Sequence, residues 1–151
     1  MGAWLRLSMV LTPLIPGLVG GLLATVVMTV VMMIVGEGGP PPTASFVAKF
    51  AGGEAEEHKM PGMVLHLLYG IGAGGVLAVG APLVGVELGD VAVSVGVGLA
   101  YGVALMVVGM VFWMRLVIGA EPDRRMMAAF AAAHVTYGIV LGAFLSTGVL
   151  A

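Results

Sequence analysis

Four long apolar segments make up most of this chain, and they restrict its fold to a bundle of membrane-spanning helices. Each holds about 20 residues or more, which is the length that an α-helix needs to cross a hydrocarbon core of about 30 Å. They cover residues 16–36, 61–83, 91–118 and 126–150. Backbone in lipid must satisfy its own hydrogen bonds, so such segments form helices. We therefore predict an all-α fold: an integral membrane four-helix bundle, with residues 1–151 as a single transmembrane domain.

The composition agrees with the lipid bilayer as the main partner. Only 9% of the 151 residues are charged and 60% are hydrophobic, which leaves too little polar surface for a soluble domain of this size. The net charge of −2 gives no basic patch, so we predict no nucleic-acid binding. The chain has no cysteine, which excludes disulfides, thiolate metal ligands and thiol catalysis.

The N-terminal stretch, residues 1–14, precedes the first predicted span, which begins at Pro16 in its first helical turn. Arg6 is its only positive charge, and no convincing small-residue cleavage site follows, so a signal peptide is disfavoured. We predict an uncleaved interfacial segment with Trp4 and Arg6 at the lipid headgroups.

The first connection, residues 37–60, is the only sizeable polar region. Three consecutive prolines, Pro40 to Pro42, stop the first helix, and a short amphipathic segment is predicted at 43–51. The later cluster of Glu54, Glu56, Glu57 and His58 could ligate a metal, but it is more typical of a solvated charge run.

The distribution of basic residues predicts the orientation of the spans. One side of the membrane would carry Lys49, Lys59, Arg115, Arg124 and Arg125, whereas the other carries only Arg6. We therefore predict that connections 37–60 and 119–125 are cytoplasmic and that both termini lie outside the cell membrane.

A five-residue pattern, His-x-x-Tyr-Gly, occurs in both the second and the fourth span. It begins at His66 and again at His134, an offset of 68, and five of nine positions are identical through Gly74 and Gly142. The repetition predicts two similar helical hairpins that form a parallel internal repeat. A weaker match at an offset of 82 aligns Gly20, Met28 and Met32 with Gly102, Met110 and Met114.

Helical spacing places each copy of the pattern on one face of its span. The two stripes are His66, Tyr69, Gly70 and Gly74, and His134, Tyr137, Gly138 and Gly142. Each contains a Gly-x-x-x-Gly, which allows close helix approach in lipid, so the glycines are predicted helix-packing residues. The two imidazoles are then expected to face one another inside the bundle.

Ionisable side chains within membrane spans are functional candidates, and four roles fit this pair. The histidines, with Tyr69 and Tyr137 beside them, could bind haem b through two imidazoles. A transition metal held by His66, His134, Met28 and Met110 is a second role. The third is a proton or ion relay in a small oligomeric transporter or channel, and the fourth is purely structural hydrogen bonding that locks the bundle.

Catalysis finds no support in the sequence. No known catalytic motif occurs, and all eight acidic residues fall in or beside connections, so we predict a protein that is not an enzyme. A homo-oligomer or a larger membrane complex is the expected assembly, because four helices alone enclose little space.

The first span resembles uncharacterised small prokaryotic membrane proteins of the YagU-like kind. The resemblance rests on residues 17–29, GLVGGLLATVVMT, followed by the consecutive prolines, and covers a quarter of the chain. It implies a multi-span inner-membrane protein and supplies no site residues.

Overall fold

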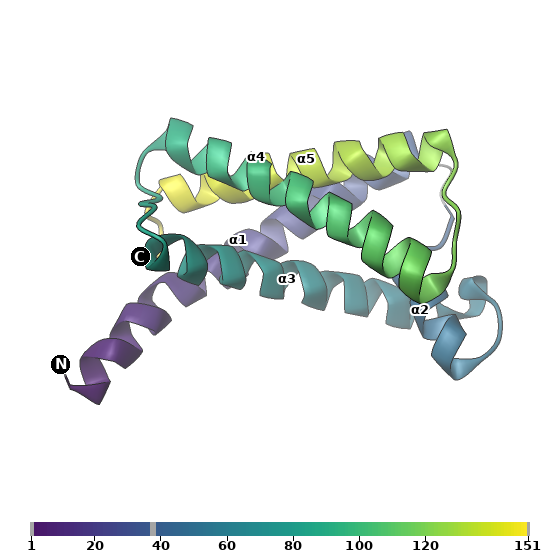
Figure 1. Cartoon of the computed structure of the whole chain (residues 1–151), viewed down its shortest axis with the longest axis horizontal. Coiled ribbons are helices and arrows are strands. Elements are labelled where there is room, and N and C mark those ends of the chain that lie inside the picture. The colour runs from purple at the N-terminus through teal and green to yellow at the C-terminus, as the bar shows by residue number, and fades with distance from the viewer. Residues whose placement is uncertain (1, 37–38, 151) are drawn as a thin grey trace.

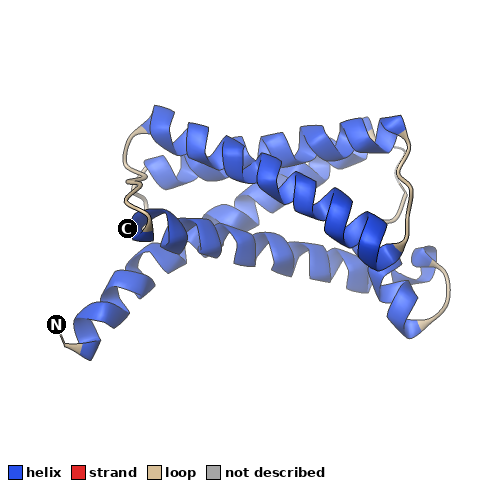
Figure 2. Ribbon diagram, viewed as in Figure 1, coloured by secondary structure: helices blue, strands red, loops and turns tan. Residues whose placement is uncertain are grey.

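The computed structural model describes residues 2–36 and 39–150, and every regular element in these ranges is a helix. In chain order the elements are α1 (Ala3–Val35), α2 (Pro42–Ala51), the 3-10 helix η1 (Ala55–His58), α3 (Lys59–Leu83), α4 (Val91–Val108), the π-helix η2 (Gly109–Ile118) and α5 (Arg124–Ser146). The predicted all-helical fold is confirmed (Figure 2).

Four helical stretches are long and apolar enough to cross a membrane. They run over Leu11–Val35, Ala55–Leu83, Val91–Ile118 and Arg124–Ser146. Their outward faces expose large apolar side chains such as Leu22, Val26, Val76, Val103 and Ile139. Apolar surface on this scale is costly in water but suits lipid. The prediction of several membrane-spanning helices is confirmed by the length and the apolar composition of these four stretches.

The spans pair as two hairpins that meet along α1 and α5. α1 packs against α3, α4 packs against α5, and α1 also contacts α5 across the bundle (Figure 1). Both termini and the connection between α3 and α4 lie at one end of the bundle. The opposite end holds α2 and the two other connections, and we call it the connection end.

Glycines close each hairpin by bringing two backbones together. In the first hairpin, a Cβ added to Gly74 would lie 2.3 Å from the carbonyl oxygen of Gly17. In the second, a Cβ on Gly138 would lie 2.2 Å from the carbonyl oxygen of Gly98. Neither backbone position tolerates a side chain, so glycine is required at both contacts.

The two hairpin contacts correspond at an offset different from the one predicted for the first and third spans. Gly21 meets Gly70 and Gly74, and Gly98 meets Gly138 and Gly142, so the equivalent glycines on α1 and α4 are 77 residues apart. At the predicted offset of 82, Gly20 would correspond to Gly102, which packs on Gly138 within its own hairpin, but Gly20 faces Leu141 and Phe144 of α5. The alignment at 82 therefore matches residues on different helix faces.

Two helix ends differ from the sequence-based expectation. α1 begins at Ala3, so Pro13 and Pro16 lie inside it and Pro16 is not in its first turn. Helices in membranes tolerate such prolines because neighbouring groups satisfy the freed carbonyls. The side chains of Trp4 and Arg6 lie outside the described part of the chain. α5 ends at Ser146 and not at residue 150, because Gly148 turns into the left-handed region at φ +65°.

α2 lies across the connection end and ties α3 to η2. The Thr43 hydroxyl donates to the Gly62 carbonyl at 2.7 Å, and the fully buried Ala44 packs on Gly62 itself. On the other side, the Lys49 ammonium donates to the carbonyls of Val117 and Ile118, the last residues of η2. A cation at the carbonyl end of a helix is favourable, so α2 is held at both edges.

Candidate functional site

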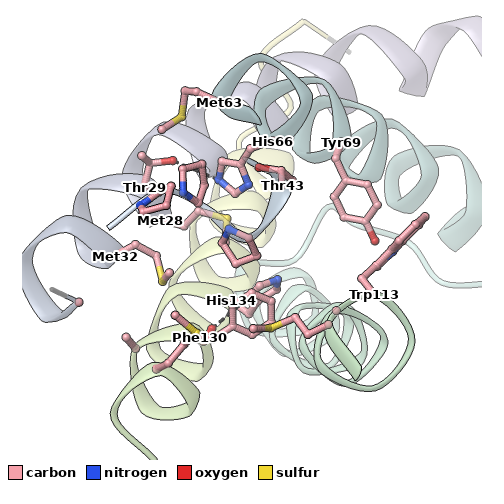
Figure 3. A pocket seen from close by; sticks show the side chains of 18 of the residues that line it. Met28, Thr29, Met32, Thr43, Met63, His66, Tyr69, Trp113, Phe130 and His134 are labelled. Carbon is pink, nitrogen blue, oxygen red and sulfur yellow. Dashed lines mark hydrogen bonds between the residues drawn. The ribbon is translucent and has the colours of Figure 1, made fainter. Parts of the chain in front are cut away.

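A cavity of about 670 Å³ lies between the two hairpins near the connection end. All four long helical stretches and α2 contribute to its wall, as the close view in Figure 3 shows. The labelled lining residues are Met28, Thr29, Met32, Thr43, Met63, His66, Tyr69, Trp113, Phe130 and His134. Both motif histidines therefore line one cavity, His66 from α3 and His134 from α5.

The hydrogen bonds around His66 fix which ring nitrogen carries its proton. Its Nε2 lies 3.2 Å from the Thr29 hydroxyl oxygen. That hydroxyl donates its single proton to the carbonyl of Thr25 at 2.7 Å, so toward the imidazole it can only accept. His66 Nε2 is therefore the donor, and in the neutral ring Nδ1 keeps a free lone pair.

His134 has the opposite arrangement. Its Nδ1 lies 2.9 Å from the carbonyl oxygen of Phe130, one turn back on the same helix. A carbonyl only accepts, so Nδ1 donates and Nε2 of the neutral ring keeps the lone pair. The Phe130 ring packs against the imidazole with centroids 4.2 Å apart. Both the hydrogen bond and the ring contact restrict the orientation of His134.

The site therefore presents two oriented lone pairs in an apolar wall. They belong to His66 Nδ1 and His134 Nε2, and each ring is held by a hydrogen bond from its other nitrogen. An imidazole oriented in this way is how proteins prepare a metal ligand, and it is equally an acceptor for an O–H or N–H group. The arrangement suits the binding of a metal ion or of a ligand that carries an O–H or N–H group.

The two motif tyrosines differ in position. Tyr137 is 1% exposed, and its hydroxyl donates to the Gly70 carbonyl at 2.6 Å, which links α5 to α3. Tyr69 is 42% exposed and lies on the cavity wall, where its hydroxyl points toward Trp113 in the view of Figure 3. A third tyrosine, Tyr101 on α4, donates to the Ala73 carbonyl at 2.8 Å. Two tyrosines of the second hairpin thus hold α3.

Methionine sulfurs line the cavity, but they are not the set that the sequence predicted for a metal. Met28 lies at the wall as expected, together with Met32, Met63 and Met114, whereas Met110 is not among the lining residues. The third span continues as the π-helix η2 from Gly109, and its hydrogen bonds from i to i+5 change the rotation per residue, so its side chains are turned relative to those of a continuous α-helix. Met114 therefore lies at the wall and Met110 does not.

A haem held by both imidazoles fits this geometry poorly. The free nitrogen of His66 is Nδ1, which is adjacent to the ring carbon that carries the side chain. A flat macrocycle coordinated there would meet the residue's own Cβ, whereas Nε2 points away from the backbone. Bis-imidazole ligation would therefore require His66 to give up its hydrogen bond to Thr29. A single small ion needs no such change, since proteins coordinate metals through either nitrogen.

The acidic cluster of the first connection forms no metal site. Within residues 2–36 and 39–150, no group of three or more His, Asp or Glu side chains is placed to hold a metal ion. His58 Nε2 instead bonds the Gly52 carbonyl at 2.7 Å, and Glu56 forms an exposed ion pair with Lys59.

Several cavity residues carried no signal in the sequence. Trp113, Phe130 and Thr29 lie outside the repeated motif, yet all three line the site with the histidines. Tyr101 could have been noticed as the third tyrosine and the only one outside the motif. Comparison with known proteins adds no information, because no protein-family model, curated protein or solved structure matches this chain.

Proposed function

We propose that this chain is a non-enzymatic multi-span membrane protein that binds a hydrophobic ligand in the cavity between its hairpins. His66 and His134 are its polar contacts to the ligand. One observation carries the proposal: each hairpin supplies one imidazole to the same cavity, and each imidazole is oriented by the protein while one nitrogen stays free.

The cavity supports ligand binding more than a purely structural role. Its volume of about 670 Å³ lies within the range of small-molecule sites, and a mostly apolar wall with a few placed polar groups is typical of them. Histidines that only locked the bundle would use both nitrogens on neighbouring helices. Here the second nitrogen of each ring has no protein partner among the described residues, so it is available to a ligand in the cavity.

Purification of the intact chain in mild detergent tests the proposal. We expect a co-purifying small molecule that solvent extraction and mass spectrometry detect, and that His66→Leu with His134→Leu removes. His58→Gln is the matched control, because His58 lies outside the cavity wall and bonds only the nearby Gly52 carbonyl. Equal recovery of the molecule from all three proteins would contradict the proposal.

A soft metal ion is the second candidate ligand, and methionine thioethers at the wall favour it. Met28, Met32, Met63 and Met114 surround the cavity with the two imidazoles, and thioether with imidazole suits Cu(I). Visible spectra of oxidised and dithionite-reduced protein, with metal analysis of the same sample, separate a metal, a haem b and a colourless organic ligand.

We further propose that the connection end faces the cytoplasm, so that the cavity lies near that surface. The excess of Lys and Arg on connections 37–60 and 119–125 supports this orientation. The chain contains no cysteine, so single cysteines at Glu56 and Glu87 are clean reporters. In intact cells, a membrane-impermeant maleimide should label Glu87→Cys but not Glu56→Cys.

We also propose that the two hairpins are copies of one unit. The motif repeats at an offset of 68, and equivalent glycine contacts repeat at 77 on the partner helices. If so, residues 1–88 and 89–151 expressed as separate chains should each insert as a hairpin and co-purify.

A further inference from the structure

Hydroxyl groups near the imidazoles have no proton left for a ligand. Thr29 donates to the Thr25 carbonyl, Tyr137 to the Gly70 carbonyl and Thr43 to the Gly62 carbonyl. A hydroxyl has a single proton, so each of these groups can offer a ligand only its oxygen. The prolines at residues 40–42, which also line the cavity, have no N–H at all.

The remaining side-chain donors at the wall lie away from the histidine pair. Tyr69 is 42% exposed, and its hydroxyl points toward Trp113 on the right of the view in Figure 3. Lys59 precedes His66 by seven residues on the same helix and Arg125 precedes His134 by nine, so each lies about two helical turns or more from the imidazole. Around the imidazoles, the side chains of the described residues therefore offer lone pairs and no free N–H or O–H.

Aromatic and sulfur groups form much of the rest of the wall. Phe46 and Trp113 contact one another edge to face with centroids 5.5 Å apart, and Phe130 lies on α5 beside His134. Ring edges, ring faces and thioethers all make favourable contacts with a flat aromatic ring.

We infer that the ligand is a hydrophobic aromatic molecule with a ring hydroxyl, a phenol or hydroquinone, which donates its O–H to His66 Nδ1 or His134 Nε2. The inference rests on the proposed function and names its ligand class. A molecule that carries only acceptors, such as an ether or a quinone carbonyl, would cover both lone pairs without giving either a proton, and that state is unfavourable. Sites built to hydrogen-bond a hydroxyl reject analogues that lack it.

A matched pair of probes tests this class directly. 4-tert-Octylphenol and its methyl ether have nearly the same shape and apolar area, but only the phenol donates a hydrogen bond. We expect the intact chain in lipid nanodiscs to bind the phenol about tenfold more tightly than the ether, as titration calorimetry would measure, with empty nanodiscs subtracted.

Substitutions locate the origin of that preference. In the double variant His66→Leu, His134→Leu the preference for phenol should fall to about twofold or less, while the affinity for the ether stays within about twofold. His58→Gln should keep the full preference. An equal preference in the double variant, or no preference in the unmodified chain, would overturn the inference.

The outcomes separate the inference from the proposed function. If the phenol and the ether bind equally well in the cavity, the ligand class is wrong and the binding function stands. If neither probe binds and the protein carries a metal ion at the histidine pair, both the ligand class and the hydrophobic-ligand function are wrong.

A measurement without substitutions covers the case in which the double variant fails to fold. The chain has three histidines, so ¹⁵N-histidine labelling gives few resonances. Phenol should move the resonance of at least one lone-pair nitrogen, His66 Nδ1 or His134 Nε2, more than those of the two protonated nitrogens. A shift confined to His58, or none at all, would overturn the inference.

Discussion

The two copies of His-x-x-Tyr-Gly share their sequence but make different contacts. In the first copy, on α3, the histidine bonds another helix and the tyrosine is largely exposed. In the second, on α5, the histidine bonds its own helix and the tyrosine is buried against the opposite hairpin. Only the glycines behave alike, since both pairs pack on the partner helix of their own hairpin.

Neighbouring residues explain why the histidines differ. The carbonyl one turn before His66 belongs to Gly62, and the Thr43 hydroxyl of α2 occupies it. His66 therefore turns to Thr29 on α1. The carbonyl one turn before His134 belongs to Phe130, and no α2-like segment covers it, so the imidazole bonds it directly. The presence of α2 near His66, and the lack of such a segment near His134, thus determine which ring nitrogen of each histidine keeps its lone pair for the cavity.

In both copies the motif glycines bring two helices together, whereas the hydrogen bonds of the histidine and the tyrosine depend on the neighbouring residues. Three of the four motif glycines, Gly74, Gly138 and Gly142, meet backbone atoms of the partner helix, so these contacts depend on the motif itself. The contacts of histidine and tyrosine depend on which residues of other elements come within reach. Each of the following predictions tests one part of this division.

Glycine substitutions should produce the largest effects. Gly138→Ala places a Cβ 2.2 Å from the Gly98 carbonyl oxygen, a backbone atom that cannot move alone. We expect a loss of about 3 kcal/mol in the free energy of unfolding, at the upper end for overpacked sites. Unfolding of purified protein by SDS titration, followed by circular dichroism, measures it. Gly72→Ala is the control, since nothing lies within 4 Å of its added Cβ.

The equivalent substitution in the first copy should be rescuable. Gly70→Ala meets a side chain, the Thr25 hydroxyl, at 1.9 Å. Adding Thr25→Ala should recover part of the lost stability, whereas no single side-chain truncation should rescue Gly138→Ala. A rescue of both, or of neither, would break the distinction between the two glycine contacts.

The tyrosines should give the next largest difference. Tyr137→Phe removes the hydroxyl that donates to the Gly70 carbonyl. We expect a loss of about 1 kcal/mol in the free energy of unfolding. Tyr69→Phe should change stability by less than about 0.5 kcal/mol, because its side chain is 42% exposed. The same SDS titration compares them. Equal costs would mean that the motif tyrosines are equivalent despite their different burial.

The fold class and the spans could be predicted from the sequence because both follow from the length of apolar runs. The glycine contacts could be anticipated because spacing on a helix places Gly70 with Gly74 on one face. The start of α1 could not, because Pro16 is an ordinary helix-start signal that lipid-embedded helices override. A helix-start signal is judged from the nearby sequence alone, whereas the tolerance of a proline inside a helix depends on the neighbouring helices.

The histidine pair was also predictable as a candidate, but the site around it was not. That Thr29 accepts from His66 depends on how α1 and α3 are rotated about their axes. Met114 replaces Met110 at the wall because α4 continues as a π-helix, and nothing in the residue pattern indicates that change of hydrogen bonding. Spacing rules assume a uniform helix, so they fail where the helix type changes.

Removing the acceptor of His66 should have a smaller effect, confined to the first copy. Thr29→Val keeps the shape of the side chain and leaves His66 Nε2 without its partner, at a cost of about 0.6 kcal/mol. We expect the ¹⁵N resonances of His66 to show a mixture of tautomers while those of His134 stay unchanged. A change at His134 would show that the two imidazoles share one network.

The methionines four residues apart should differ in their effect on ligand binding more than in their effect on stability. Met28 and Met32 of α1 both line the cavity, whereas of Met110 and Met114 only the second does. Met110→Leu and Met114→Leu conserve volume, so each should change the unfolding free energy by less than about 1.5 kcal/mol. Only Met114→Leu should alter the affinity for the phenol probe, because only that side chain reaches the ligand. If Met110→Leu alters it as strongly, Met110 also reaches the ligand, and the difference between the two hairpins at this level disappears.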